Sequence, residues 1–123
     1  MKFNKIGIKF IDIDTAADFF IKNLNFLLHS RLKTRTNKRI VCLEKDGFIL
    51  EIFETKNRPL ENGFLKLLSF EVGDIEKTVS FLKSNNIEII EDATESCDDD
   101  GNKFFYAYFK GPESIKLGLF QKI

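Results

Sequence analysis

The chain carries one pattern twice, and this repeat constrains its fold more than any other feature. Four residue pairs recur at a constant offset of about 62 positions. The matched pairs are Asp12 and Asp74, Ile13 and Ile75, Phe19 and Phe81, and Asn23 and Asn85. In both halves the pattern follows an alternating apolar stretch and precedes a run of short apolar stretches. We therefore predict two similar modules, residues 1–60 and 61–123, with function where the modules meet.

Length and composition indicate one globular domain. At 123 residues and 43 % hydrophobic content, the chain has enough apolar side chains for an ordinary core. No apolar run approaches the roughly 20 residues that span a membrane. No signal-peptide pattern opens the chain, so we expect a cytoplasmic protein without a membrane partner. Cys42 and Cys97 are too few for a disulfide framework and do not form a C-x-x-C pair, and we expect neither to be catalytic.

The net charge is zero, which argues against nucleic acid or an anionic membrane as partner. The zero conceals an asymmetry. Residues 1–60 hold 12 Lys and Arg against 7 Asp and Glu, and residues 61–123 hold 7 against 12. Two interpretations stay open. The unlike halves can attract each other within a chain or across a homodimer, which we favour, or they can form the two walls of a cleft.

The first module has the periodicity of a β-α-β-β-β unit. A period-two stretch predicts a strand over residues 5–11, and Asp14 is the predicted N-cap of a helix with apolar positions at helical spacing up to Leu24. Further strands are expected over residues 26–34, 38–44 and 48–54. The last two should form a hairpin, because Asp46 and Gly47 accept the positive φ angles of a tight turn.

The second module repeats this order after a polar linker over residues 55–64. A strand is expected from Leu67 to Val72, followed by a helix that Asp74 caps. The apolar positions of this helix are Ile75, Val79 and Leu82. The remaining strands are expected over residues 87–90, 104–109 and 115–120. Residues 91–102 are strongly acidic, but they lack the first and last ligands of a calcium loop, so we expect a solvated hairpin loop there.

The two modules resemble those of the vicinal oxygen chelate superfamily of glyoxalases, bleomycin-resistance proteins and extradiol dioxygenases. The resemblance covers essentially the whole chain and rests on the order of several short motifs. The motifs are the D-x-[DE] helix starts, Leu24-Asn25-Phe26, Ile49-Leu50-Glu51-Ile52-Phe53 and Phe109-Lys110-Gly111-Pro112-Glu113-Ser114. The last looks like the aromatic-x-Asp-Pro-x-Gly turn of the superfamily, with Gly111 and Ser114 in place of Asp and Gly.

This resemblance implies a single glyoxalase-like domain of the α+β class. Its two tandem βαβββ modules would form a curled, open mixed sheet, with helices on the convex face and a ligand cavity on the concave face. Metal-dependent members resemble one another in four ligands, taken from the first and last strands of each module. Matching register places those positions at Lys5, Glu51, Leu67 and Gly118.

Of these four residues only Glu51 can bind a metal ion at neutral pH. One carboxylate does not replace the three or four protein donors that such a site uses. His29, the only histidine, falls in the second strand, away from these positions. We therefore expect no metal and no cofactor.

Period two sorts each strand into an apolar set that faces a helix and a mixed set that faces the cavity. The cavity-facing candidates for ligand binding are Lys5, Lys9, Glu51, Phe53, Leu67, Ser69, Glu71, Lys116 and Phe120. One alternating set from residues 104–109 should join them, and the sequence does not distinguish which. Lys5 and Glu51 are expected to meet, either as a structural ion pair, which we favour, or as an anion site beside a general base.

Four cationic residues recur at alternate positions of the second strand. They are His29, Arg31, Lys33 and Arg35. Cations on an exposed strand discourage edge-to-edge pairing, which is the interpretation we favour. If the row instead borders a cavity, it would attract a carboxylate or a phosphate.

Three functions are compatible with these observations. The one we favour is a metal-independent small-molecule-binding protein of the glyoxalase or bleomycin-resistance type, a homodimer with its ligand in the concave cavity between modules. The second is a lyase or isomerase of the same superfamily that uses Lys5, Glu51 or Glu71, with or without a metal held by other residues. The third is an interaction module whose cavity is filled by side chains.

Overall fold

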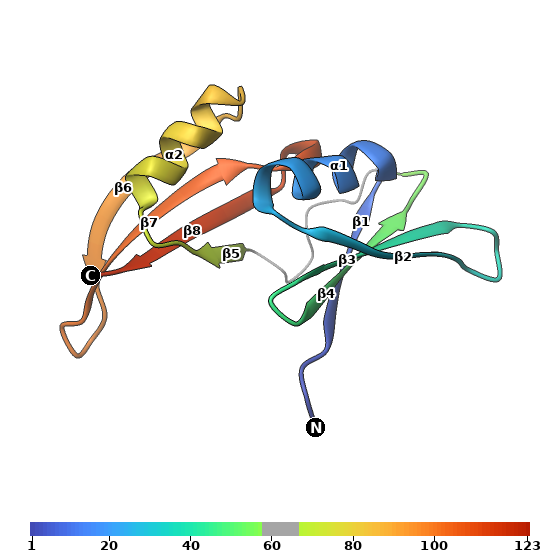
Figure 1. Cartoon of the computed structure of the whole chain (residues 1–123), viewed down its shortest axis with the longest axis horizontal. Coiled ribbons are helices and arrows are strands. Elements are labelled where there is room, and N and C mark those ends of the chain that lie inside the picture. Colours follow the sequence, from blue (N-terminus) through green and yellow to red (C-terminus); the bar gives the residue numbers. More distant parts are fainter. Residues whose placement is uncertain (58–66) are drawn as a thin grey trace. The chain divides into compact units, whose positions relative to one another are not determined.

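The chain divides into two compact units, Met1–Glu61 and Asn62–Ile123. The computed structural model describes residues 1–57 and 67–123. Each unit runs strand, helix, strand, strand, strand (Figure 1). Most of the polar linker expected over residues 55–64 lies outside the described residues.

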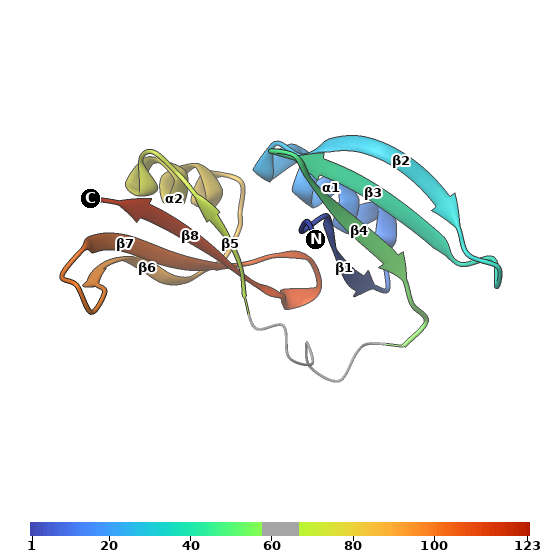
Figure 2. The same ribbon diagram turned by 90° about the horizontal axis from the view of Figure 1, so that it is seen from below.

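The first unit is a four-stranded mixed sheet with one helix. Its elements are β1 Lys5–Phe10, α1 Ile13–Leu24, β2 Leu27–Lys33, β3 Arg39–Lys45 and β4 Phe48–Glu54. The strand order is β1-β4-β3-β2, with β1 and β4 parallel and the other pairs antiparallel (Figure 2). The helix contacts β3 and β4, so it covers one face of the sheet. The predicted strands agree with these bounds to within one residue.

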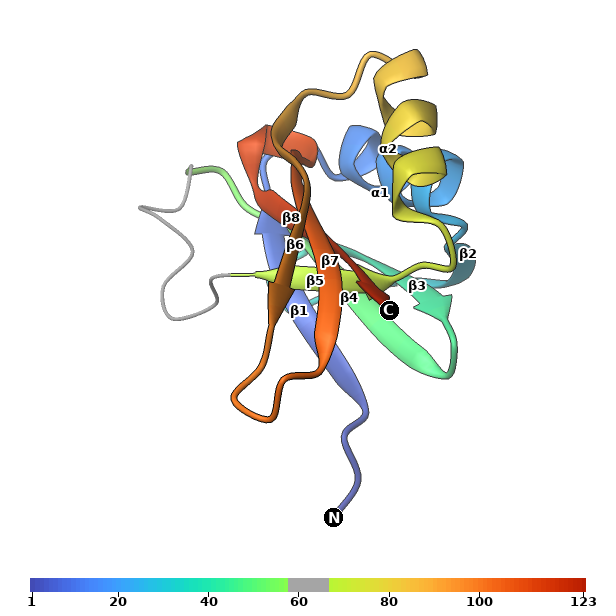
Figure 3. The same ribbon diagram turned by 90° about the vertical axis from the view of Figure 1, so that its left-hand side faces the viewer.

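The second unit repeats this topology. Its elements are β5 Leu68–Glu71, α2 Ile75–Ser84, β6 Ile89–Cys97, β7 Lys103–Lys110 and β8 Lys116–Lys122. The strand order is β5-β8-β7-β6, and α2 lies along β6, β7 and β8 (Figure 3). The predicted α+β class with two tandem βαβββ modules is confirmed, and neither sheet closes on itself. Neither helix in the described residues is long and apolar enough to span a membrane.

The duplicated acidic residues begin both helices in the same way. The backbone N–H of Thr15 donates to Asp12 Oδ1, and that of Lys77 donates to Asp74 Oδ1, each at 3.1 Å. The prediction that Asp14 is the first N-cap is wrong. An N-cap requires a non-helical backbone, which Asp12 has (φ −103°), whereas Asp14 already lies in the first helical turn.

Each helix packs its predicted apolar positions onto its sheet. In α1 the buried residues are Ile13, Ala16, Ala17, Phe20 and Leu24, as the helical spacing predicts. Their partners include Phe10, Leu43, Leu50 and Ile52, all of which are essentially inaccessible to solvent. In α2, Ile75, Val79 and Leu82 are buried. The helix-facing side of the second sheet is apolar, like that of the first. Each unit is therefore stabilised by its own small hydrophobic core between its helix and its sheet.

The second unit contains the largest departure from the sequence-based expectations. Strand β6 extends to Cys97, so the prediction of a short strand over residues 87–90 and a loop over residues 91–102 is wrong. Two register irregularities interrupt the pairing of β6 with β7, and they remove the period-two signal from the sequence. The actual loop is short. Asp98 Oδ1 accepts N–H bonds from Asp100 and Asn102 at 2.9 Å each, which makes it a turn residue.

Two tight turns depend on residues with positive φ. Asp46 and Gly47 have φ of 53° and 82°, and they join β3 to β4 as predicted. Between β7 and β8, Pro112–Ser114 form a short 3₁₀ turn in which Ser114 has φ of 64°. Gly111 precedes this turn, and a Cβ on it would lie 2.6 Å from Leu117 Cδ1.

This last turn yields two opposite mutational effects. Ser114→Gly should raise the free energy of unfolding by about 1 kcal/mol, because glycine adopts positive φ without a steric penalty. Gly111→Ala should lower it by about 1–3 kcal/mol, because the new methyl group collides with the buried Leu117 side chain. Urea unfolding measures both. Changes of the same sign in the two variants would contradict this account of the turn.

The N-cap of α1 gives a pH-dependent prediction. Hydrogen bonds from the Thr15 backbone and hydroxyl lower the pKa of Asp12 below its ordinary value of 3.8. A lowered folded-state pKa stabilises the fold above pH 3.8, and this contribution is lost as the pH falls through the folded-state pKa. Asp12→Ala should therefore destabilise the protein at neutral pH, and its difference from the wild type should shrink in acid.

Urea unfolding at neutral and acidic pH checks this effect. Asp18→Ala is the matched control, since Asp18 is an exposed carboxylate of the same helix whose nearest cation, Lys22, lies 3.9 Å away. We expect a smaller effect from Asp18→Ala at neutral pH. Equal effects of the two substitutions would mean that the cap does not contribute.

Candidate functional site

Strand register determines which side chains of the first sheet point away from α1. Parallel pairing places Lys5 beside Ile49, Gly7 beside Glu51 and Lys9 beside Phe53, and β3 adds Ile40 and Cys42. We call this surface the first open face. Its residues are Lys5, Gly7, Lys9, Ile40, Cys42, Ile49, Glu51 and Phe53. The residues between them in the strands, such as Leu50 and Ile52, are buried on the helix side.

Lys5 and Glu51 form an ion pair on the first open face. Lys5 Nζ lies 3.2 Å from Glu51 Oε1, and the side chains are 54 % and 13 % exposed. Because the lysine is largely in water, the attraction is screened and stabilises the fold only modestly. The pair nevertheless places an ammonium group against the one carboxylate among the four positions that the sequence resemblance matched to metal ligands.

The middle of the first open face is apolar. A Cβ on Gly7 would lie 2.8 Å from Phe53 Cε2, so the phenyl ring lies directly over the glycine backbone. On β3, Ile40 and Cys42 are nearly inaccessible to solvent. The first open face therefore has an apolar centre beside the Lys5–Glu51 pair, with Lys9 exposed at its far end.

The second open face is the side of the second sheet that points away from α2. From β5 and β8 it carries the predicted residues Leu67, Ser69, Glu71, Lys116, Gly118 and Phe120. The pairing of Tyr106 with Phe120 and of Tyr108 with Gly118 adds one alternating set of β7, namely Phe104, Tyr106 and Tyr108. The sequence alone did not distinguish which alternating set of residues 104–109 lies on this face. The other set, with Ala107 and Phe109 buried, faces the helix.

Four rings of the second open face form a continuous row. Ring centroids are 5.1 Å apart between Phe120 and Phe104, 6.4 Å between Phe104 and Tyr106, and 5.4 Å between Tyr106 and Tyr108. At its end Lys116 Nζ lies 3.9 Å from the centroid of the Tyr108 ring, a cation–π contact. We call these four rings the aromatic row. All four are half-buried, so their remaining surface is available for contact.

A carboxylate lies beside the aromatic row. The Tyr106 hydroxyl donates to Glu91 Oε1 at 3.3 Å. Burial raises the pKa of Tyr106 above its ordinary value of 10.0, and the negative charge of Glu91 raises it further. Tyr106 therefore remains a protonated hydrogen-bond donor throughout the neutral range. Glu91 is not among the residues predicted for the site, because the acidic pattern of residues 91–102 predicted a loop there.

The residues present do not fit the metal centre of the superfamily. In the second unit, a Cβ on Gly118 would meet Leu67 Cδ1 and Ser69 Oγ, both at 3.2 Å, so leucine covers the glycine at the two ligand-equivalent positions. Within residues 1–57 and 67–123, no three His, Cys, Asp or Glu side chains lie close enough together to hold a metal ion. The Lys5–Glu51 pair offers a single carboxylate, which an ammonium already contacts.

The predicted row of four cations on β2 is only partly correct. A bulge between Leu28 and Ser30 breaks the alternation at His29, whose Nδ1 lies 3.1 Å from Ser30 Oγ. Arg35 lies in the turn beyond the strand. Only Arg31 and Lys33 share a face, and they lie on the α1 side of the sheet.

The state of Tyr106 can be measured directly, because Tyr106 and Tyr108 are the only tyrosines in the chain. In a Tyr108→Phe variant, a titration that follows phenolate absorbance should show Tyr106 ionising above pH 10.0, its ordinary value. Adding Glu91→Gln should lower this midpoint, because a neighbouring negative charge disfavours the phenolate. Glu95→Gln is the control on the same strand. A midpoint unchanged by Glu91→Gln would remove Glu91 from the site.

Comparisons with known proteins bear on the fold. No protein-family model and no curated protein matches the sequence. A glyoxalase family protein from Enterococcus faecalis matches the structure with a TM-score of 0.77 and 23 % identity, over 97 % of this chain and 96 % of that chain. The trypanothione-dependent glyoxalase I of Leishmania major matches with a TM-score of 0.76 and 14 % identity, over 98 % and 86 %.

A glyoxalase/bleomycin resistance protein/dioxygenase from Alicyclobacillus acidocaldarius is also similar, with a TM-score of 0.71 and 15 % identity, over 99 % of this chain and 92 % of that chain. These matches cover nearly the whole chain, and at such low identity they show the fold alone. The order of motifs along the sequence predicted the same fold. The chain therefore has the vicinal oxygen chelate fold.

Proposed function

We propose that this protein is a metal-independent small-molecule-binding protein of the glyoxalase/bleomycin-resistance type, a cytoplasmic homodimer that binds a planar or hydrophobic ligand on the second open face. The aromatic row is the observation that carries this proposal. Small-molecule sites combine an apolar surface with a few polar groups that orient the ligand. The aromatic row has this composition, with Lys116 at one end and the Tyr106–Glu91 pair beside its middle.

The arrangement of the rings suits a planar ligand. Half-buried rings held by a sheet lose little conformational freedom when a ligand packs on them, so stacking contributes to affinity at small entropic cost. Tyr106 can donate its hydroxyl to Glu91 or to the ligand, and Lys116 attracts an anionic substituent. A neutral or anionic aromatic compound therefore suits this surface better than a cationic one.

The metal-free part of the proposal rests on the residues at the ligand-equivalent positions. Lys5 offers an ammonium group where the metal-dependent members offer a donor, and it contacts Glu51 at 3.2 Å. Leu67 and Gly118 provide no donor atom in their side chains. Binding through ring contacts requires none of these positions to hold an ion.

A second candidate function is lyase or isomerase chemistry with Glu51 as the base and Lys5 as the group that holds an anionic substrate. The observation that favours it is the largely buried carboxylate of Glu51 on the first open face. A general base must lie within hydrogen-bond reach of the proton it removes. Conversion of a bound compound that is lost in Glu51→Gln, with binding retained, would identify an enzyme. Glu71→Gln tests the other carboxylate in the same way.

The protein contains its own reporter for the proposed site. The chain has no tryptophan, and both of its tyrosines belong to the aromatic row. A change in intrinsic tyrosine fluorescence on adding a ligand therefore originates at the second open face. We expect saturable quenching by planar aromatic compounds, with anionic and neutral members bound more tightly than cationic ones.

Substitution of the rings tests the location of binding. Phe104→Ala and Phe120→Ala should each weaken the affinity about ten-fold, because each removes one stacking surface. Phe48→Ala is the matched control, since Phe48 also belongs to an exposed ring pair, with Phe3 at 5.5 Å, in the first unit. Circular dichroism verifies that each variant is folded. An equal loss of affinity in Phe48→Ala, or no quenching by any compound, would contradict the proposal.

A further inference from the structure

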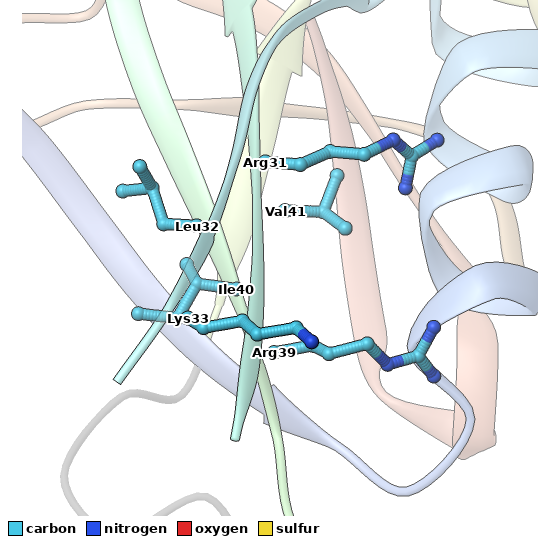
Figure 4. Close-up of a pocket in the computed structure, with 6 residues that line it drawn as sticks. All are labelled: Arg31, Leu32, Lys33, Arg39, Ile40 and Val41. Carbon is cyan, nitrogen blue, oxygen red and sulfur yellow. The ribbon is translucent and has the colours of Figure 1, made fainter. Parts of the chain in front are cut away.

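We propose a second binding site, for a small molecule that carries a phosphate group, in a hollow lined by residues of β2 and β3. We call it the cationic hollow. It has a volume of about 250 Å³ and is lined by Arg31, Leu32, Lys33, Arg39, Ile40 and Val41 (Figure 4). The three cationic side chains extend toward the α1 side of the first sheet. The cations of the hollow therefore lie on the opposite side of the sheet from the first open face, with which the hollow shares Ile40, and the proposed aromatic site is not involved.

Strand pairing brings the three cations together. Lys33 is the register partner of Arg39. Arg31, the partner of Val41, lies two residues along the same pair of strands and therefore on the same face. Side chains of register partners in an antiparallel pair share a face, and like charges directly opposite each other are destabilising. The fold thus holds Lys33 beside Arg39, whose charge Asp14 and Glu54 offset, so an anion here would be attracted chiefly by Lys33 and Arg31.

The three cations differ in what surrounds them. Arg39 is held in place, with Nη2 3.0 Å from Glu54 Oε2 and Nη1 3.2 Å from Asp14 Oδ2. Within residues 1–57 and 67–123, neither Arg31 nor Lys33 forms an ion pair. The hollow thus contains one positioned guanidinium and two cations without a counter-charge, and the two carboxylates leave it with a net positive charge.

The chemistry of these groups selects a phosphate. A guanidinium presents a planar fork of N–H donors that matches two oxygens of a phosphate, and an ammonium supplies a compact charge to a third. Val41, only 2 % exposed, provides an apolar floor that raises the strength of such contacts. A purely protective role at the sheet edge would require exposed cations but no hollow and no third cation anchored by carboxylates.

A small phosphate compound is favoured over a nucleic acid. Residues 31–39 hold five Lys and Arg and no acidic residue, but the chain as a whole is neutral. A nucleic-acid surface typically neutralises on the order of 6–10 phosphates with cations spread along it. Here the cations gather around one hollow of limited volume, which matches a single phosphate group.

A titration with inorganic phosphate at constant ionic strength, monitored by the NMR shifts of the backbone amides, tests the proposal. We expect saturable shifts confined to β2, β3 and the first turn of α1. Arg31→Gln and Lys33→Gln should each weaken phosphate binding about ten-fold, because each removes a charge-assisted hydrogen bond. Both residues are exposed, so the variants should fold, and their urea unfolding curves verify this.

The control is Arg35→Gln, which removes the same charge from the same hairpin outside the hollow and should change affinity less than about two-fold. Equal loss in Arg35→Gln would mean unspecific attraction and would overturn the site. Absence of saturable shifts would overturn it as well. A duplex DNA oligonucleotide is the last probe. Tighter binding of DNA than of phosphate, weakened equally by Arg35→Gln and Arg31→Gln, would replace the phosphate site with a nucleic-acid surface.

Discussion

The parallel pairing of the first and last strands in each unit is the interaction on which the rest of the structure depends. A parallel pair requires a crossover, and in each unit that crossover contains the helix that covers one face of the sheet. Once Gly7 is paired with Glu51 and Ser69 with Gly118, the facing of every residue in these strands follows. The helix side is then apolar in both units, and the open side is left to vary.

The open faces of the two sheets carry different residues. In the first, glycine in β1 lets the Phe53 ring lie on the backbone, and an ion pair of Lys5 and Glu51 lies beside it. In the second, three alternate residues of β7 and one of β8 line up as the aromatic row. The two units share residues that satisfy backbone hydrogen bonds, above all Asp12 and Asp74, which cap the helix starts.

Sequence-based prediction worked best where one period extended over a whole element. Both helices and the regular strands have buried sets that period 3.6 or period two identifies, and Asp46-Gly47 marked its hairpin correctly. It did not work where the backbone departs from regular pairing. The bulge at His29 moved one residue out of the predicted row, and two irregularities in β6 hid a strand that carries Glu91.

The sequence by itself determined the order of the elements, the duplication, the fold and the facing of most strands, because these depend on local periodicity and turn chemistry. It also indicated that three of the four ligand-equivalent positions lack a metal donor, since that depends only on residue types. Only the tertiary structure decided which set of β7 residues shares a face with Phe120, and that Arg31 and Lys33 lie beside Arg39. These neighbours lie on different strands, so only the pairing of strands brings them together.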